Sequence, residues 1–359
     1  MPPINAKTFP AETRGAKKIA VVDLGFLGDT VHLVPALWEI KDHFPGAQLH
    51  VVTSPLGTEV LKLAPCVDRA WVYPLGPPSP PWWKHWNLLF ALRREHFDVA
   101  FNLNGMSRAL ITTALLNGRN AAVRWGPRHY WWHRLFSRNW IADEMPALPV
   151  YERRRHFLKL CGFDSKPARF DLNVPGEDRD WARANIPAGS VHLSLNASSS
   201  AKEWPREANV KFLRELFASG LDRKVVMTIG NNPRERERLE YVCREISDDR
   251  LLPVNERLSI SRLAAVLEQC ALHVGPDSGV VHLAWALNLP TVSFFRRDPG
   301  MKYWVPPAPK HAHFEADCPC LAARKPVCHQ SNGAACLGRI APELVARDVL
   351  GRLNGCNKS

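Results

Sequence analysis

The segment Lys18–Leu24 (KIAVVDL) runs directly into Gly25–Thr30 (GFLGDT), and this junction decides the fold. A short β-rich run without polar alternation predicts a strand that is buried on both faces. Apolar residues then recur at helical spacing as far as Ile40, and Gln48–Thr53 (QLHVVT) is the next apolar run. Strand, glycine turn, helix and strand make a βαβ unit. The sequence therefore predicts a doubly wound parallel sheet, with a further strand at 97–103.

The same alternation restarts in the second half of the chain. Short apolar runs predict strands at 190–195, 224–230, 272–275 and 291–295. Helical patterns alternate with these runs at 209–217, 260–269 and 279–288. The predicted architecture is therefore of α/β class, with two Rossmann-like domains facing each other across a central cleft. In such sheets, ligands bind at the carboxyl ends of the strands.

A polar stretch at about 171–189, with two prolines and two glycines, separates the two halves. We expect an N-terminal domain at 1–175, of which 1–16 are flexible, and a C-terminal domain at 176–335. A helical segment follows at 336–359, for which packing back on the N-terminal domain is one option.

Composition excludes several classes of protein. The chain has 359 residues and a net charge of +12, and it contains no apolar run near the ~20 residues of a membrane-spanning helix. It also lacks the periodic glycine or polar low-complexity tracts of fibrous and disordered proteins. The first 18 residues contain no apolar core of a secretory signal, so we expect a cytoplasmic protein.

Basic and aromatic residues are concentrated in one part of the chain. The segment 101–142 holds six arginines and no acidic residue, and seven of the 13 tryptophans fall between Trp82 and Trp140. Such a surface suits an anionic partner: nucleic acid, phospholipid head groups or a phosphorylated glycolipid. The alternative is a solvated arginine face with tryptophans in ordinary core positions. The aromatic segment 82–90 could likewise lie on a membrane, line an acceptor site or pack on its own domain.

Three predicted strand ends carry polar residues that could act on a ligand. Asp29 follows the first strand, where it could cap the next helix or serve as a general base. Ser198–Ser200 and Lys202 follow a later strand and make either a phosphate cradle or an ordinary polar turn. In Asp277–His282 (DSGVVH), a glycine at a helix start permits close approach of an anion.

In this order and at these spacings, the motifs resemble glycosyltransferase family 9, whose best-known members are ADP-heptose:lipopolysaccharide heptosyltransferases. The resemblance extends from about Lys17 to Leu353. Five short elements carry it: Gly28-Asp29, Phe44–Ala47 (FPGA), Lys202–Pro205 (KEWP), Asp277–His282 (DSGVVH) and Asp298–Gly300 (DPG).

The resemblance implies a GT-B type fold with an acceptor-binding N-terminal domain and a nucleotide-sugar-binding C-terminal domain. The implied reaction is an inverting transfer of heptose from ADP-heptose to an anionic lipopolysaccharide inner-core acceptor of the Kdo–lipid A type. Asp29 would be the general base, Lys202 would stabilise the leaving diphosphate, and Asp277 would hold heptose hydroxyls. Further donor-binding residues would be Ser198, Ser199, Asn231, Glu235, Ser278, Gly279 and His282.

On the acceptor side, the implied binding residues are Arg124, Arg128 and Arg134. Catalysis would need no cofactor. The protein would work at the cytosolic face of the inner membrane as a peripheral protein, without a nucleic-acid partner. Two other readings stay open: an autotransporter heptosyltransferase that modifies protein serines, and a nucleotide-sugar-binding protein without catalysis. Nucleic-acid binding could also account for the charge, but the sequence shows none of its recognisable modules.

Four of the nine cysteines cluster in a loop at 318–336. Cys318, Cys320, Cys328 and Cys336 could hold a structural zinc or iron ion, and His329 lies beside them. The spacing departs from the usual pairs of zinc-binding cysteines. It therefore leaves a metal site, disulfides and free thiols all open.

Overall fold

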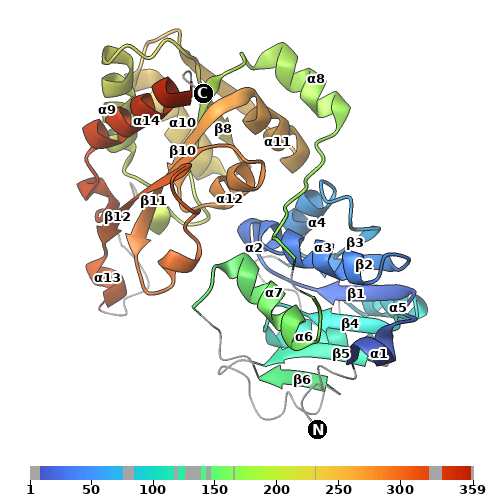
Figure 1. Ribbon diagram of the computed structural model, residues 1–359. Coiled ribbons are helices and arrows are strands. Elements are labelled where there is room, and N and C mark those ends of the chain that lie inside the picture. Colours follow the sequence, from blue (N-terminus) through green and yellow to red (C-terminus); the bar gives the residue numbers. More distant parts are fainter. Residues whose placement is uncertain are drawn as a thin grey trace. The chain divides into compact units, whose positions relative to one another are not determined.

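The computed structural model of the chain describes residues 9–75, 85–116, 120–125, 139–142, 147–164, 166–230, 232–322 and 334–356. The chain divides into two compact units, Met1–Asn173 and Val174–Ser359 (Figure 1). Each unit contains one six-stranded sheet in which every pair of neighbouring strands is parallel.

The sheet of the N-terminal unit has the strand order β3-β2-β1-β4-β5-β6, which is the order of a doubly wound nucleotide-binding sheet. Its strands are β1 (Lys18–Val22), β2 (Gln48–Thr53), β3 (Arg69–Val72), β4 (Val99–Asn102), β5 (Asn120–Trp125) and β6 (Asn139–Ala142). Its helices are α1 (Phe9–Thr13), α2 (Leu27–Val31), α3 (Val34–His43), α4 (Pro55–Leu61), α5 (Trp86–Arg94), α6 (Ser107–Leu115) and α7 (Val150–Leu160).

Strand β1 explains why the opening segment has no polar alternation. Ile19 and Val21 point to one face of the sheet and join a core with side chains of α1, α3 and α7. Ala20 and Val22 point to the other face and join a core with side chains of α5 and α6. Because successive side chains of a strand face opposite ways, burial of both faces requires an apolar residue at every position.

The C-terminal unit repeats this topology, with the strand order β12-β11-β10-β7-β8-β9. Its strands are β7 (Ser190–Leu193), β8 (Val225–Ile229), β9 (Leu251–Arg257), β10 (Cys270–Pro276), β11 (Thr291–Arg297) and β12 (His311–Asp317). Its helices are α8 (Gly176–Asn185), α9 (Arg206–Ala218), α10 (Pro233–Glu245), α11 (Ile260–Gln269), α12 (Gly279–Ala286), α13 (Pro319–Ala322) and α14 (Pro342–Cys356), and a 3-10 turn, η3, spans Ser200–Lys202.

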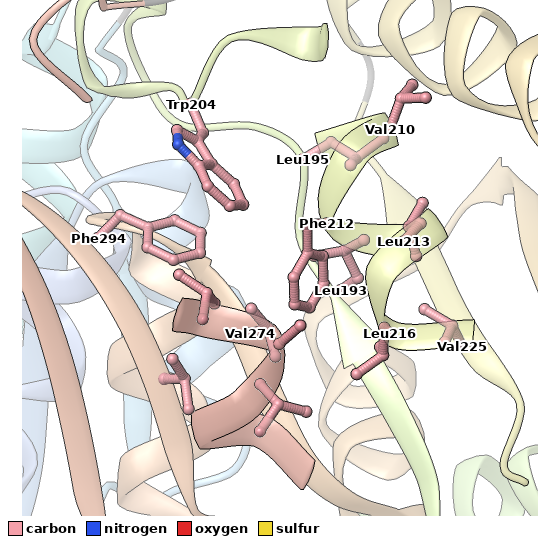
Figure 2. Close-up of a cluster of buried hydrophobic side chains, with 14 of the residues drawn as sticks. Leu193, Leu195, Trp204, Val210, Phe212, Leu213, Leu216, Val225, Val274 and Phe294 are labelled. Atoms are coloured by element: carbon pink, nitrogen blue, oxygen red, sulfur yellow. The ribbon is translucent and has the colours of Figure 1, made fainter. Parts of the chain in front are cut away.

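A buried aromatic cluster anchors the loop that follows β7. The Trp204 ring lies 4.5 Å from the ring of Phe294 on β11 and 6.0 Å from that of Phe212 on α9, measured between centroids (Figure 2). All three side chains are fully buried. Trp204 lies two residues after the end of η3, so this packing fixes the chain that leaves the turn carrying Lys202.

Helix α14 packs on α9 within the C-terminal unit (Figure 1). Its apolar residues Val345, Val349 and Leu353 recur every fourth position, which places them on one face, and all three join the core of that unit. The sequence left packing on the N-terminal domain as an option for 336–359. In the structure the apolar stripe covers α9, and this helix belongs to the C-terminal unit.

None of the helices in the described parts of the chain is long and apolar enough to span a bilayer.

Two histidines form a buried pair inside the C-terminal sheet. His192 on β7 and His273 on β10 approach with their Nδ1 atoms 2.8 Å apart, and His192 Nε2 lies 3.0 Å from Thr228 Oγ1. Burial lowers the pKa of His192 to about 3 and holds the pKa of His273 well below its ordinary value. Both rings are therefore neutral at pH 7.

We expect this pair to make folding acid-sensitive. Below about pH 6.5 the unfolded chain protonates these histidines while the folded chain does not. The free energy of unfolding should therefore fall by about 1.4 kcal/mol per pH unit for each such residue. Urea denaturation of the wild type and of His192→Asn/His273→Asn between pH 7.5 and pH 5 measures the slope. If the free energy of unfolding of the double variant fell as steeply with pH as that of the wild type, the two histidines would not be the cause of the acid sensitivity.

Candidate functional site

Asp29 lies where the first strand of the N-terminal sheet passes into helix α2. It is the third residue of α2, and its Oδ2 accepts the backbone N–H of Phe26, the N-cap residue, at 3.1 Å. The carboxylate thus satisfies the helix start from inside the first turn rather than from the N-cap position. Gly25 leaves room for it, because a Cβ there would lie 2.3 Å from Asp29 Cβ.

The charged surroundings of Asp29 were not predicted from the sequence. Arg154 on α7 places its Nη2 3.6 Å from Asp29 Oδ1 and 3.0 Å from Oδ2 of the buried Asp23. Burial raises the pKa of Asp29, and the guanidinium opposes that rise. With 27% of its side chain exposed, Asp29 is a partly accessible carboxylate that can accept a proton at the carboxyl edge of the sheet.

Lys202 and Asp277 form an ion pair in the C-terminal unit. Lys202 Nζ lies 2.6 Å from Asp277 Oδ2, and both side chains are partly exposed. Lys202 ends η3 after β7, and Asp277 follows β10, the neighbouring strand. Because β7 and β10 are parallel, their carboxyl ends meet at one edge of the sheet, and the sequence expectation that both residues lie there agrees with this placement.

His282 lies one turn inside α12, behind Asp277. Its Nε2 is 3.9 Å from Asp277 Oδ1, and its ring lies 5.4 Å from that of Trp304. Burial lowers the pKa of His282 to about 4. The ring is therefore neutral at pH 7 and contributes a dipole to this site rather than a positive charge.

The start of α12 presents backbone donors beside the ion pair. Ser278 is the N-cap residue, its side chain makes no capping hydrogen bond, and Gly279 is the first residue of the helix. Ser278 Oγ is buried and has no hydrogen-bond partner in the described part of the chain. A helix N-terminus with an unengaged hydroxyl has the chemistry of an anion site.

Buried residues hold the loop that carries Lys202. Ser198 and Ser199 are exposed, and Ser199 caps η3 by accepting the backbone N–H of Ala201 at 3.3 Å. The buried Glu203 accepts the backbone N–H of Ala197 at 3.0 Å and pairs with Arg234 on α10 at 2.9 Å. Sequence reasoning assigned no role to Glu203 or Arg234, although Glu203 stands inside the KEWP element.

Side chains after β8 accept hydrogen bonds from the backbone of the loop in which they lie. Glu235 Oε2 accepts the backbone N–H of Gly230 at 2.6 Å, and Asn232 caps α10 by accepting the backbone N–H of Arg234 at 3.0 Å. Asn231 lies outside the described residues. A pocket of about 330 Å³ opens beside the start of α10 and is lined by Gly230, Asn232, Pro233, Arg236, Glu237 and Glu240.

Two sequence predictions fall partly outside the described residues. Arg124 belongs to β5, but its side chain is not described, and Arg128 and Arg134 lie outside altogether. In the cysteine loop, Cys318 and Cys336 are buried and Cys320 is the second residue of α13, while Cys328 lies outside the described residues. Among the described residues, which leave out Cys328 and His329, no three metal-binding side chains are grouped to hold an ion.

Comparison with known proteins decides the family. The family model described as glycosyltransferase family 9 (heptosyltransferase) matches residues 85–334. The chain belongs to glycosyltransferase family 9. As a family 9 member, it is a glycosyltransferase, as the resemblance in the sequence implied.

Relatives of this family 9 chain agree with that assignment. Lipopolysaccharide heptosyltransferase 1 of Escherichia coli K12 is 24% identical over 301 residues, covering 79% of this chain and 89% of that protein. A family 9 glycosyltransferase from Veillonella parvula superposes with a TM-score of 0.76 at 16% identity, over 94% of this chain and 97% of its own. The E. coli ADP-heptose lipopolysaccharide heptosyltransferase II gives 0.73 at 16% identity, over 95% and 99%. These similarities confirm the expected GT-B type α/β fold.

Proposed function

We propose that this glycosyltransferase moves heptose from ADP-heptose to an anionic inner-core acceptor of lipopolysaccharide, of the Kdo–lipid A type. The observation that carries the proposal is the edge formed by β7 and β10. There the Lys202–Asp277 pair lies beside the uncapped N-terminus of α12, which suits a nucleotide diphosphate sugar. The names of the similar heptosyltransferases support the choice of sugar and acceptor.

In this proposal the C-terminal unit binds the donor. The Lys202 ammonium has three N–H donors, so it can keep Asp277 and also meet a phosphate oxygen. Asp277 holds heptose hydroxyls, with the neutral His282 behind it. The diphosphate is further bound by Ser198, Ser199, Ser278 and the backbone N–H of Gly279. The pocket beside α10 takes the adenosine, with Glu235 holding the backbone of Gly230 at its rim. Asn231, which lies outside the described residues, stays a proposed donor contact.

The N-terminal unit binds the acceptor and supplies the base. An acceptor hydroxyl oxygen attacks the anomeric carbon as the bond from that carbon to the diphosphate breaks. ADP leaves with the electron pair, and Asp29 takes the hydroxyl proton. Attack opposite the leaving group inverts the anomeric configuration. The Arg- and Trp-rich segment supports acceptor binding through Arg124, Arg128 and Arg134. No cofactor is needed, since Lys202 and the start of α12 supply the positive potential that the diphosphate requires.

A substrate panel tests this function. The purified protein is incubated with ADP-heptose, GDP-sugars or UDP-sugars against Kdo₂-lipid A, heptosylated cores and serine-containing autotransporter peptides. We expect consumption of ADP-heptose with an inner-core acceptor and no turnover of the GDP- or UDP-sugars. Transfer to a peptide serine would favour the autotransporter function. Turnover of another nucleotide sugar alone would overturn the proposal.

Helix α5 is the surface proposed to bring the enzyme to the inner membrane. Trp86 and Phe90 are 42% and 58% exposed and stack with ring centroids 5.8 Å apart, while Leu89 and Leu92 anchor the helix in the domain. Arg93 and Arg94 follow on the exposed side, and the helix contains no acidic residue. Aromatic rings followed by cations suit the interface of an anionic bilayer.

Removing the two rings is expected to weaken membrane binding. Trp86→Ser/Phe90→Ser should reduce partitioning onto vesicles of phosphatidylglycerol and phosphatidylcholine by about tenfold or more, because it removes most of the insertable apolar area. Co-sedimentation measures the effect. The control is Leu344→Ser on α14, another large apolar side chain that is 50% exposed. Equal partitioning of the α5 variant and the wild type would contradict the assignment.

A further inference from the structure

Arg154 is a buried arginine that touches two carboxylates. It lies on α7 between Arg153 and Arg155, and its side chain is 6% exposed. Its Nε donates to Asp23 Oδ2 at 3.0 Å. Its Nη2 lies 3.0 Å from the same oxygen and 3.6 Å from Asp29 Oδ1. One rigid guanidinium therefore connects α7 to the carboxylate at the start of α2.

Both carboxylate oxygens of Asp23 already accept hydrogen bonds. It is fully buried directly after β1, and its Oδ1 accepts the backbone N–H of Gly25 at 3.1 Å and the side-chain N–H of Asn104 at 3.0 Å. Its Oδ2 accepts the Nε–H of Arg154. Donors from three segments of the chain therefore fix Asp23, and Asp23 in turn fixes the plane of the guanidinium.

The geometry points to Arg154 as a positioning residue: held by Asp23, it fixes the Asp29 carboxylate in the orientation and ionised state that a base needs. This inference rests on the proposed function of Asp29. The two Asp29 oxygens then have separate constraints. Oδ2 accepts the Phe26 N–H, and Oδ1, the oxygen facing the guanidinium, is set by Arg154. A rotation of the carboxylate would break one or the other.

The electrostatics agree with this geometry. Burial raises the pKa of Asp29, Arg154 lowers it, and the like charge of Asp23 raises it by less than Arg154 lowers it. Helix α4, which packs on α2, carries Glu59 and no basic residue. Among the described residues of this unit, Arg154 is therefore the cation that opposes the rise in the pKa of Asp29. Without Arg154, Asp29 should protonate at higher pH. The acidic limb of the profile of activity against pH should therefore move to higher pH.

Three variants separate position from charge. Arg154→Lys keeps the charge but cannot hold both carboxylates with a planar fork, so we expect kcat to fall about tenfold with a nearly unchanged acidic limb. Arg154→Met removes both effects, and we expect a loss of about 10²-fold in kcat. Because Arg154→Met leaves Asp23 buried and unpaired, Arg154→Met/Asp23→Asn is the variant that preserves folding. In it the acidic limb should still move to higher pH, with the donor KM within about twofold of wild type.

The chain offers a matched control one residue further along α7. Arg155 is equally buried, and its Nε donates to Glu39 Oε2 at 3.1 Å, away from Asp29. Arg155→Met/Glu39→Gln removes a buried pair of the same kind. It should lower stability without moving the acidic limb. An equal shift in this control, or an unshifted limb in Arg154→Met/Asp23→Asn, would overturn the inference.

A second readout does not depend on turnover. Carboxyl ¹³C NMR titration reports the pKa of Asp29 directly, with the Asp29→Asn spectrum assigning the signal. We expect a higher pKa in Arg154→Met/Asp23→Asn than in the wild type and no change in the Arg155 control. If the wild type transfers no heptose, the proposed function fails while this titration still tests Arg154. An unchanged Asp29 pKa would overturn the role of Arg154 alone.

Discussion

Replacing Asp29 by asparagine is expected to reduce kcat for heptosyl transfer by about 10²- to 10⁴-fold, while the Kd of ADP-heptose stays within about twofold. Asparagine has the same shape, and its oxygen can still accept the Phe26 N–H that Asp29 accepts at 3.1 Å. It cannot take a proton from the acceptor hydroxyl. Steady-state kinetics with Kdo₂-lipid A gives kcat, and calorimetry gives the donor Kd.

A second capping carboxylate provides the control for this variant. Asp98 Oδ2 accepts the backbone N–H groups of Lys17 and Lys18, at 2.8 and 3.1 Å, at the amino end of β1. Asp98→Asn therefore changes a carboxylate that, among the described residues, accepts hydrogen bonds from backbone N–H groups, and it should leave kcat within about twofold. Turnover of Asp29→Asn near the wild-type rate would show that Asp29 is only a structural cap.

Lys202→Met is expected to have the second large effect, on the donor side. Removing the ammonium takes away the cation that we propose to meet the diphosphate, and it leaves Asp277 without its partner at 2.6 Å. We expect kcat/KM for ADP-heptose to fall by about 10²- to 10³-fold, as for loss of one preset donor to a developing negative charge. The Kd of ADP should also rise, whereas the acceptor KM should change little.

Lys224 is a matched lysine at the amino ends of the strands of the same sheet, opposite the carboxyl ends where Lys202 lies. It precedes β8, and its Nζ donates to the backbone oxygen of Asp249 at 2.6 Å. Lys224→Met removes a cation of the same unit away from the β7–β10 edge, so donor kinetics should stay unchanged. If both variants lost ADP affinity equally, the effect of Lys202 would be one of net charge and not of the site.

Most interior strands of the two sheets were predictable from sequence, whereas the interior strand β5 and the edge strands were not. Strands β1, β2, β7, β8, β10 and β11 are apolar runs because they are buried on both faces. The edge strands β9 and β12 carry charged and exposed positions, and β9 contains Pro253, so their patterns resemble loops. Strands β5 and β6 lie inside the Arg- and Trp-rich segment, where charge and aromatic residues obscured the pattern.

Some residues of the candidate site could likewise be predicted from the sequence, and others could not. Asp29, Lys202 and Asp277 were visible in the sequence because each follows a strand within a short local motif. Arg154 was not, because it meets Asp23 across 131 positions, and a run of three arginines on a helix does not show which one is buried. Glu203 and Arg234 were missed for the same reason, since their pairing depends on how α10 packs beside the η3 loop.

The product of the wild-type reaction tests the account most directly. ADP-heptose and Kdo₂-lipid A are incubated with the enzyme, and the product is analysed by mass spectrometry and by NMR of its anomeric proton. We expect one heptose added to the acceptor for each ADP released, with an anomeric configuration opposite to that of the donor. Release of ADP without gain of mass by the acceptor, or a retained configuration, would contradict direct displacement assisted by Asp29.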